Sequence, residues 1–483
     1  MTDYIERLNS SQRLPVMDTE GAVLVIAGAG SGKTRVLTTR IAHLVNDLGV
    51  NPANILAITF TNKAADEMKT RLEKMIDGAD RIWASTIHSM CVRILRANIS
   101  AMGFSKNFSI YDDDDKERAV KRIILDMGLE ADKYLKKAKD VISNAKCGDF
   151  TPTEYKDDNP FIPEIEKLTE IFIRYNDYLK KCNALDFDDL LIYALRLFED
   201  HPEVLEYYSE KFRYVHVDEF QDTNYAQFEL AILLSGGYEN LMVVGDDDQS
   251  IYKFRGATIE NILHFDEKVP GAKVIKLEEN YRSTSHILNA ANSVIRNNFG
   301  RRGKELWSNK GEGEKVFIKQ FDNQNEEAKF IVNKMMELVI REKRKYSDFA
   351  VLYRTNAQSN SIENVLMKSG IPYRVVGGRR FYERKEIKDI LAYLCVVNNP
   401  SDNLRLERII NEPKRKIGEA TMTAVRAIAE SEPIEGGMFR VMEHAEEYPS
   451  VSKAQGKFAP FVALIRSLQK TAETEKLSGV VRA

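Results

Sequence analysis

The chain has 483 residues, which is too long for one ordinary core and suggests several domains at roughly 100–200 residues each. Its 70 Lys and Arg nearly balance 73 Asp and Glu, so the net charge of −3 gives no overall sign of nucleic-acid binding, and any such site must be a local groove. The four cysteines form no Cys-x-x-Cys pair, which argues against structural zinc, an iron–sulfur cluster or a disulfide framework.

Membrane and export signals are not evident in the sequence. No apolar run approaches the ~20 residues of a membrane-spanning helix. The N-terminus has neither the basic start nor the apolar core of a signal peptide. The sequence therefore predicts a cytoplasmic protein.

The most informative segment follows the apolar run at residues 23–26. It consists of Ala27, Gly28, Ala29, Gly30, Ser31, Gly32, Lys33 and Thr34. Glycines let backbone N–H groups converge on phosphate oxygens, Lys33 would reach the β and γ phosphates, and Thr34 would hold Mg²⁺. Ala27 stands where the P-loop pattern has its first glycine. A glycine-rich turn without ligand would leave Gly-Lys-Thr at a strand-to-helix junction unexplained, so we predict a nucleoside-triphosphate site.

Strand-like runs recur at residues 23–26, 55–59, 214–217, 241–244 and 274–277, with helical spacing between them. This alternation predicts an α/β fold with a parallel sheet. From residue 89 to 209 this alternation gives way to a long stretch of helical spacing, which predicts a helical insertion. The helical spacing is broken once, near residues 148–152. Within it, Asp112 to Asp115 indicate a solvated loop or a helix cap.

A second α/β pattern begins after Arg282. Strands are expected at 316–319, 349–353 and 373–376, and a helix is expected to carry Phe330, Met335, Leu338 and Val339. From about residue 378 helical patterns return, with turns at Asn399-Pro400 and Gly436-Gly437. Two α/β units suggest two lobes with a cleft between them.

Two carboxylates, Asp218 and Glu219, directly follow the run at 214–217. The carboxyl ends of parallel strands are where α/β sheets hold their ligands. Asp218 is expected to hold Mg²⁺ through its water shell, and Glu219 to orient and deprotonate the water that attacks the γ-phosphate. The alternative is an acidic loop cap, which the P-loop earlier in the chain makes less attractive.

A further strand leads into residues 245–256. Gln249 lies beside a cluster of carboxylates, and an amide there is suited to sensing the γ-phosphate by hydrogen bonding. Tyr252 and Phe254 alternate with Lys253 and Arg255, a pattern that suits single-stranded nucleic acid because stacking faces are interleaved with charges. Taken alone, such a stripe is more often core packing.

The ordered set of motifs resembles the UvrD/PcrA/Rep family of superfamily 1 DNA helicases. The motifs are Leu8-Asn9-x-x-Gln12, the P-loop, residues 59–65, residues 85–89, residues 218–222, residues 245–257 and Asn280-Tyr281-Arg282-Ser283, with similar blocks at 353–358, 371–373 and 410–418. The resemblance covers residues 1 to about 420. It implies a P-loop NTPase lobe of RecA-like fold, with a second such lobe that is incomplete.

The resemblance also assigns the nucleotide contacts. Gln12 would read the adenine edge and select ATP, while Tyr281 would stack on the ring. Arg282 would reach the γ-phosphate from the second lobe as an arginine finger, and Arg35 would also touch the nucleotide. Without the resemblance, Arg282 would be read as a surface ion-pair partner worth ~0–1 kcal/mol.

The DNA contacts are likewise carried over from the family. The stacking residues would be Phe60, Phe187, Tyr252 and Phe254, and the polar contacts would be Thr61, Asn62, His88 and Arg255. By itself Phe187 in a helical segment reads as core, and His88 as a satisfied buried histidine. Phe254 stands where the family commonly has Trp, which predicts a weaker grip, because stacking is worth about 1–3 kcal/mol per base.

The domain plan that the resemblance implies has four parts. Residues 1–88 and 210–280 would form the first RecA-like ATP-binding lobe, 89–209 its helical insertion, 281–377 the first part of the second lobe, and 378–483 a partial helical insertion. The implied function is an ATP- and Mg²⁺-dependent 3′-to-5′ DNA helicase and translocase in DNA repair or replication. Its substrates would be single-stranded DNA and 3′-tailed duplex DNA.

Two late blocks of the family have no counterpart after residue 420, one resembling Thr-x-His-x-x-Lys-Gly-Leu and one resembling Thr-Arg-Ala. We therefore expect a chain truncated within its second lobe, which binds nucleotide but hydrolyses it poorly. Two alternatives stay open. One is an ATP-dependent DNA-binding module without productive unwinding, and the other is a helicase–nuclease subunit of the AddA or RecB kind.

Overall fold

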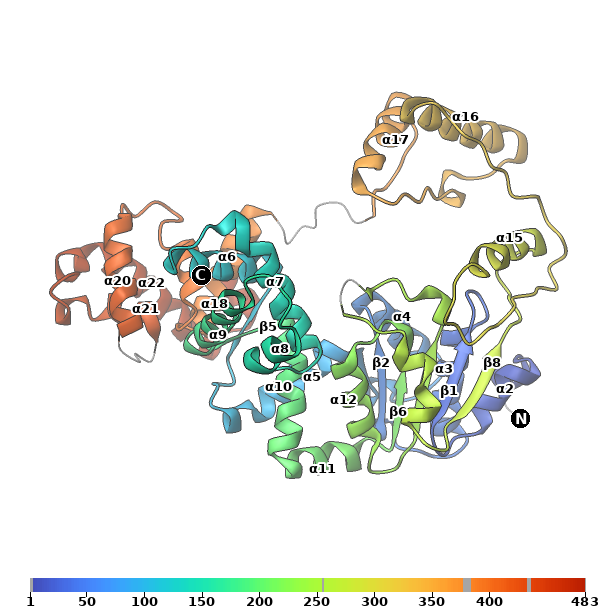
Figure 1. Ribbon diagram of the computed structural model, residues 1–483, viewed down its shortest axis with the longest axis horizontal. Coiled ribbons are helices and arrows are strands. Elements are labelled where there is room, and N and C mark those ends of the chain that lie inside the picture. Colours follow the sequence, from blue (N-terminus) through green and yellow to red (C-terminus); the bar gives the residue numbers. More distant parts are fainter. Residues whose placement is uncertain (1–2, 254–255, 377–383, 432–435, 483) are drawn as a thin grey trace. The chain divides into compact units, whose positions relative to one another are not determined.

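The computed structural model describes residues 3–253, 256–376, 384–431 and 436–482, and these fall into two compact units. Unit 1 consists of Met1–Gly313 and Asp389–Ala483, and unit 2 of Glu314–Lys388. Figure 1 shows the elements of both units along the chain.

Unit 1 is built on a six-stranded parallel sheet with the order β3-β2-β6-β7-β1-β8. The strands are β1 (Val23–Ala27), β2 (Ile55–Thr59), β3 (Trp83–Thr86), β6 (Tyr214–Val217), β7 (Leu241–Gly245) and β8 (Lys273–Leu277). β1, β2, β6 and β7 are buried along their whole length, because a parallel sheet is covered on both faces and selects continuous apolar runs. The five strands predicted in this part are confirmed, and β3 is an additional edge strand.

Successive residues of each strand serve opposite faces of the sheet. On one face, Val23 and Val25 pack with α3 (Lys33–Asn46) and α4 (Asn62–Glu73). On the other, Leu24 and Ile26 pack with α5 (Ile87–Asn98), α10 (Phe187–Asp200) and α12 (Tyr225–Ser235). The short α2 (Ser10–Met17) contacts α3 and β8. Figure 1 shows these helices around the strands.

The predicted helical stretch is mostly helix, together with a two-stranded parallel sheet of β4 (Ser109–Tyr111) and β5 (Ala184–Asp186). Its helices are α6 (Asp113–Asp126), α7 (Ala131–Cys147), α8 (Pro152–Asp158), α9 (Ile165–Lys181), α10 and α11 (Pro202–Lys211). The predicted interruption lies between α7 and α8. The acidic cluster is a helix cap, because Asp112 and Asp115 form a capping box at the start of α6.

The segment 389–482 has its own apolar core and packs on the helical stretch. It contains most of α18 (Lys385–Asn398), then α19 (Asn403–Ile409), α20 (Glu419–Ser431), α21 (Gly437–Glu443), α22 (Gln455–Thr474) and α23 (Leu477–Arg482). The buried Tyr111 hydroxyl donates to Asp402 Oδ1 at 2.9 Å, and Arg405 pairs with Asp115 at 2.9 Å. Asn399 donates through one amide to three acceptors between 2.9 and 3.0 Å away, on Ser109, Cys182 and Asn183.

Unit 2 contains α16 (Gln324–Glu342) and α17 (Asn356–Lys368), which pack around Val332, Leu366 and Ile371. The helix predicted around Phe330 is confirmed as α16. The strands predicted at 316–319, 349–353 and 373–376 are wrong, because none of these segments is a strand. The physical reason is that a strand needs a hydrogen-bonded neighbour and a covered face, whereas Ile318 and Leu352 are 89% and 94% exposed.

The remaining elements of the described chain are short. They include α1 (Asp3–Glu6), α13 (Glu260–Leu263), α14 (Phe265–Lys268) and α15 (Ser285–Ile295). Among the described helices, none combines the length and the apolar character that crossing a membrane requires.

Candidate nucleotide and DNA site

The glycine-rich loop joins β1 to α3 with backbone angles that glycine tolerates best. Gly30 and Gly32 have φ of +71° and +87°, and Gly32 is the N-cap of α3. Ser31 is fully buried, and its Oγ donates to the Gly28 carbonyl at 2.7 Å. Ala27 is the buried last residue of β1 and its φ is not positive, so the departure from glycine at this position strains nothing. The loop is thus shaped as a phosphate cradle at a helix N-terminus.

The two carboxylates predicted after β6 face the two polar residues that begin α3. Lys33 Nζ lies 3.2 Å from Glu219 Oε2, and Thr34 Oγ1 lies 3.4 Å from Asp218 Oδ2. Asp218 is buried, and its N–H donates to the Ile58 carbonyl at 2.8 Å. The structure therefore brings these four predicted site residues together at one edge of the sheet.

Two carboxyl groups at this edge of the sheet have raised pKa values. Burial, and then the charge of Glu219, raise the pKa of Asp218 to about 6. The same two causes raise the pKa of Asp222 to about 6. Glu219 itself has a φ of +52°, in the left-handed region that a non-glycine residue occupies only where its surroundings impose it. Strained backbone and raised carboxyl pKa values are typical of functional sites.

Gln221 connects this edge to the next strand, a role that the sequence analysis missed. Its side chain is buried, and its Nε2 donates to Glu219 Oε2 at 3.0 Å. Its Oε1 accepts the N–H of Asp246, just after β7, at 2.8 Å. A buried amide must satisfy both of its ends, so Gln221 joins Glu219 to the turn that carries Gln249. Its place two residues after a strand-end carboxylate was the available signal.

The donor set fits a nucleotide with a divalent cation. The hydroxyl of Thr34 and the carboxylate of Asp218 are the hard oxygen ligands that Mg²⁺ takes in small number beside phosphate and water. The charge of Lys33 is balanced by that of Glu219. The side chain of Leu306 covers Gly28, the glycine nearest β1.

The residues expected to contact the adenine ring, or the nucleotide more generally, lie around α2. Gln12 Nε2 donates to the Ser31 carbonyl at 2.8 Å, and Gln12 Oε1 accepts the N–H of Asn9 at 3.2 Å, so its amide is engaged within the protein. Asn9 also donates to the Tyr281 hydroxyl at 2.8 Å, which brings Tyr281 beside α2. Arg35 is exposed and donates to the Arg7 carbonyl at 2.9 Å.

Arg282 lies directly against the glycine-rich loop. The N–H of Tyr281 donates to the Gly30 carbonyl at 2.9 Å, and a Cβ built on Gly30 would meet Arg282 Cβ at 2.8 Å. Asn280 fixes this segment, because its Oδ1 accepts the N–H of Arg282 at 2.8 Å while its Nδ2 donates to the Ala29 carbonyl. Arg282 is exposed and belongs to unit 1 together with Lys33.

Within the described residues, the predicted DNA-contacting rings occur in two pairs. The rings of Phe60 and Tyr252 lie 4.9 Å apart, and those of His88 and Phe187 lie 6.1 Å apart, edge to face. Phe187 is the first residue of α10 and is 47% exposed, so the reading of it as a core residue does not apply. Burial lowers the pKa of His88, against the charge of Asp188.

The remaining predicted site residues make local contacts. Thr61 caps α4 by accepting the N–H of Ala64 at 3.1 Å, and Asn62 begins that helix with an exposed side chain. Gln249 is exposed, and its amide donates to the Asp246 carboxylate. Phe254 and Arg255 lie outside the described residues.

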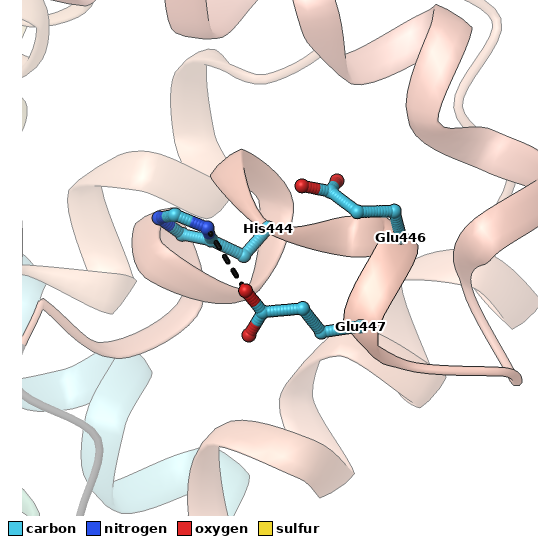
Figure 2. A group of neighbouring side chains, drawn as sticks. All are labelled: His444, Glu446 and Glu447. Atoms are coloured by element: carbon cyan, nitrogen blue, oxygen red, sulfur yellow. Dashed lines mark ion pairs between the residues drawn. The ribbon is translucent and has the colours of Figure 1, made fainter.

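A second cluster of metal-ligand types lies at the surface near α21, formed by His444, Glu446 and Glu447. Figure 2 shows the imidazole turned toward Glu447, with Nδ1 3.3 Å from its carboxylate. The guanidinium of Arg440 contacts the other ring nitrogen. With both ring nitrogens engaged and a cation alongside, this cluster reads as a surface ion-pair group.

Comparison with known proteins identifies two consecutive family domains. Residues 8–270 match the UvrD/REP helicase N-terminal domain, and residues 275–472 match the UvrD-like helicase C-terminal domain. The chain is 45% identical over 472 residues to an ATP-dependent DNA helicase PcrA of Leuconostoc citreum, covering 96% of this chain and 62% of that protein. It is also 45% identical over 484 residues to proteins of the same name from Staphylococcus epidermidis and Staphylococcus aureus, covering 100% of this chain and 66% of theirs.

The chain thus spans 62–66% of the length of these relatives. The expectation of a chain truncated within its second lobe is not borne out by these matches, since the C-terminal family domain is recognised over residues 275–472. The resemblance noted from the motifs is confirmed, and because the match at residues 8–270 alone exceeds half of the sequence, the chain belongs to the UvrD/REP helicase family.

Proposed function

We propose that this chain is an ATP-dependent DNA helicase and single-stranded DNA translocase that moves 3′ to 5′. The observation that carries the proposal is the pairing of Lys33 with Glu219 and of Thr34 with Asp218 at the carboxyl edge of the sheet. In this proposal Lys33 is the cation that binds phosphate and Glu219 is the base, and the two side chains lie within hydrogen-bond reach of each other. The relatives that share 45% identity bear the name ATP-dependent DNA helicase, which supports the same conclusion.

In this proposal each side chain of the edge has one role. A γ-phosphate draws Lys33 away from Glu219, and the freed carboxylate of Glu219 orients the attacking water and accepts its proton. Thr34 and Asp218 hold Mg²⁺, which when bound neutralises charge on the phosphate oxygens. Gln249 senses the γ-phosphate, and Arg282 stabilises the charge that spreads over the transferring phosphoryl group.

The nucleotide base and the DNA are held by residues on neighbouring elements. Gln12 reads the adenine edge and Tyr281 stacks on the ring, while Arg35 also touches the nucleotide. The backbone of the glycine-rich loop, residues 27–34, surrounds the phosphates. Single-stranded DNA stacks on Phe60, Tyr252, Phe254 and Phe187, with polar contacts from Thr61, Asn62, His88 and Arg255. The partner is single-stranded or 3′-tailed duplex DNA, and the setting is DNA repair or replication.

We assign these roles to the four segments expected from the sequence. Residues 1–88 and 210–280 bind ATP, residues 89–209 form a helical insertion that carries Phe187, residues 281–377 belong to a second lobe, and residues 378–483 to its insertion. We further propose a cytoplasmic location. The four cysteines, Cys91, Cys147, Cys182 and Cys395, are all free thiols, which agrees with a reducing compartment.

The decisive experiment is the substitution Glu219→Gln, assayed with single-stranded DNA. This change keeps the shape of the side chain but removes the base, so we expect steady-state ATP turnover to fall by about 100-fold or more while ATP affinity stays within about threefold. Glu206→Gln, on the exposed face of α11, is the matched control and should behave as wild type. Persistent turnover in Glu219→Gln would refute the assigned base.

Wild-type behaviour separates the proposal from its alternative. Turnover that rises when single-stranded DNA is added supports a translocase. DNA affinity that depends on nucleotide, without any turnover, would instead indicate an ATP-dependent DNA-binding module.

A further inference from the structure

Lys304 is a buried lysine whose ammonium lies among three consecutive carboxylates. Its side chain is 1% exposed, and Nζ lies 2.7 Å from Asp246 Oδ1 and 2.7 Å from Asp248 Oδ2, with Asp247 in contact as well. We call Asp246, Asp247 and Asp248 the aspartate turn. The turn follows β7 directly, whereas Lys304 comes from the segment after α15.

The charges of this cluster nearly compensate one another. Arg301 adds a second cation, with two contacts to Asp248 at 2.7 and 2.6 Å, so three carboxylates face two cations. The backbone N–H of Arg302 donates to Asp247 Oδ2 at 2.8 Å. Burial by itself would lower the pKa of Lys304, but the carboxylates of the aspartate turn raise it, and the ammonium stays charged.

On one side, the aspartate turn leads to the residues assigned to hydrolysis. Asp246 binds Lys304 through Oδ1 and accepts the amide of Gln249 through Oδ2. The N–H of Asp246 donates to Gln221, which in turn donates to Glu219. A shift of the turn would therefore displace both the proposed phosphate sensor and the residue that orients the proposed base.

On the other side, the segment of Lys304 leads to Arg282. Two residues on, Leu306 packs over Gly28. The carbonyl of Trp307 accepts the N–H of Asn280 at 2.8 Å, and Asn280 Oδ1 holds the N–H of Arg282 at 2.8 Å. The path from Lys304 to Arg282 is thus a short run of chain and two hydrogen bonds.

We propose that Lys304 is a positioning residue that couples Gln249 on the aspartate turn to Arg282 on the neighbouring segment. Lys304 holds Gln249 and Arg282 in fixed positions relative to the glycine-rich loop. The inference rests on the proposed function and extends it by naming the residue that makes the two nucleotide-contacting segments act together. Lys304 touches neither nucleotide nor DNA and acts through Asp246 and Asn280.

A purely structural ion pair would have different consequences. Replacing buried ion pairs with apolar residues of similar volume is often neutral or stabilising. If Lys304 served stability alone, a charge-compensated apolar replacement would keep turnover. If it positions both segments, the same replacement would lower kcat and leave nucleotide affinity nearly intact, because the glycine-rich loop and Lys33 are unchanged.

The test compares two variants of the full chain. Lys304→Met removes the ammonium and leaves three carboxylates against one cation, which endangers folding. The double variant Lys304→Met with Asp247→Asn leaves two carboxylates against one cation and so keeps the excess of one negative charge. For the double variant we expect kcat of DNA-stimulated ATP turnover to fall about tenfold or more, with KM for ATP within about threefold.

A second readout does not depend on turnover. Hydrogen–deuterium exchange should rise in peptides covering both 246–253 and 278–284 of the double variant, and stay as in wild type across β1 and β2. Lys304→Arg, which keeps the charge, should restore most of the protection and turnover. Lys273→Met is the matched control, since Lys273 lies on β8 with an exposed side chain and one ion pair to Asp18, and it should change neither readout.

The outcomes separate the inference from the proposed function. Absence of ATP turnover in the wild type would refute the proposed function, and the exchange pattern would still decide whether Lys304 couples the two segments. The inference is overturned if the wild type hydrolyses ATP and the double variant keeps kcat within about twofold of it. It is also overturned if protection from hydrogen–deuterium exchange is lost in only one of the segments 246–253 and 278–284.

Discussion

The ammonium of Lys33 lies 3.2 Å from a carboxylate oxygen of Glu219, with the lysine side chain 11% exposed and the glutamate 38%. These two residues come from different strand-to-helix junctions, after β1 and after β6. Their pairing balances the charge of the largely covered ammonium across the carboxyl edge of the sheet.

Replacing Lys33 with Ala should separate binding from stability. The pair is partly solvated, so we expect the free energy of unfolding to change by no more than about 1 kcal/mol. ATP loses a charged hydrogen-bond donor, so its affinity should fall roughly 10- to 100-fold. Titration with a fluorescent nucleotide and thermal unfolding measure the two effects. Lys69→Ala, on the exposed face of α4, is the control, and wild-type affinity in Lys33→Ala would contradict the assignment.

Asp218 gives a pH prediction. Its native pKa of about 6 lies above the ordinary value of 3.8, so the native state binds this proton more tightly than the unfolded chain does. The ionised carboxyl therefore destabilises the nucleotide-free fold above pH 6, and this cost vanishes as the pH falls below about 4.

The substitution Asp218→Asn should raise Tm at pH 8 by removing a cost on the order of 3 kcal/mol, and raise it less at pH 5. Unfolding followed by circular dichroism without nucleotide at the two pH values measures this difference. Asp77→Asn, at an exposed position, is the control. An equal gain at both pH values would show that the carboxyl is not perturbed as described.

Phe187 tests the proposed DNA surface. The ring is 47% exposed and contacts the imidazole of His88, so Phe187→Ala should leave Tm nearly unchanged. Loss of one stacking face should weaken single-stranded DNA binding by about 1–3 kcal/mol, measured by fluorescence polarisation. Phe161 is more exposed still, at 96%, and lies outside the proposed DNA contacts. If Phe161→Ala weakened binding as much as Phe187→Ala, the aromatic contact would not be specific.

Tyr111 tests the packing of residues 389–482 on the helical stretch. Its buried hydroxyl donates to Asp402, so Tyr111→Phe leaves a buried carboxylate short of one donor. We expect a loss of about 1.5–3 kcal/mol in the free energy of unfolding, followed by denaturant titration. Tyr207→Phe changes a hydroxyl on a 60% exposed side chain and should cost nothing measurable. Equal stability of the two variants would contradict the role given to the Tyr111 hydroxyl.

Much of the nucleotide edge was predictable because it depends on local sequence. A buried apolar run before glycines specifies β1 and its loop, and the positive φ of Gly30 and Gly32 follows from the residue type. The carboxylates at the end of β6 could be placed because parallel strands end at one edge of the sheet. The helical character of 89–209 followed from its apolar spacing.

The strands predicted at 316–319, 349–353 and 373–376 show the limit of that reasoning. Short apolar runs favour a strand, but a strand forms only where a neighbouring strand supplies hydrogen bonds. The local sequence does not specify that neighbouring strand.

The amino-acid sequence by itself determined the P-loop, the positions along the chain of five strands of the parallel sheet, and the family, because these depend on residue types at fixed local spacing. Only the tertiary structure decided that Gln221 bridges Glu219 to Asp246, and that Lys304 neutralises the aspartate turn from more than fifty positions away. The physical reason is that a buried amide or ammonium takes whichever partners the fold brings within about 3 Å, and no local pattern encodes that approach.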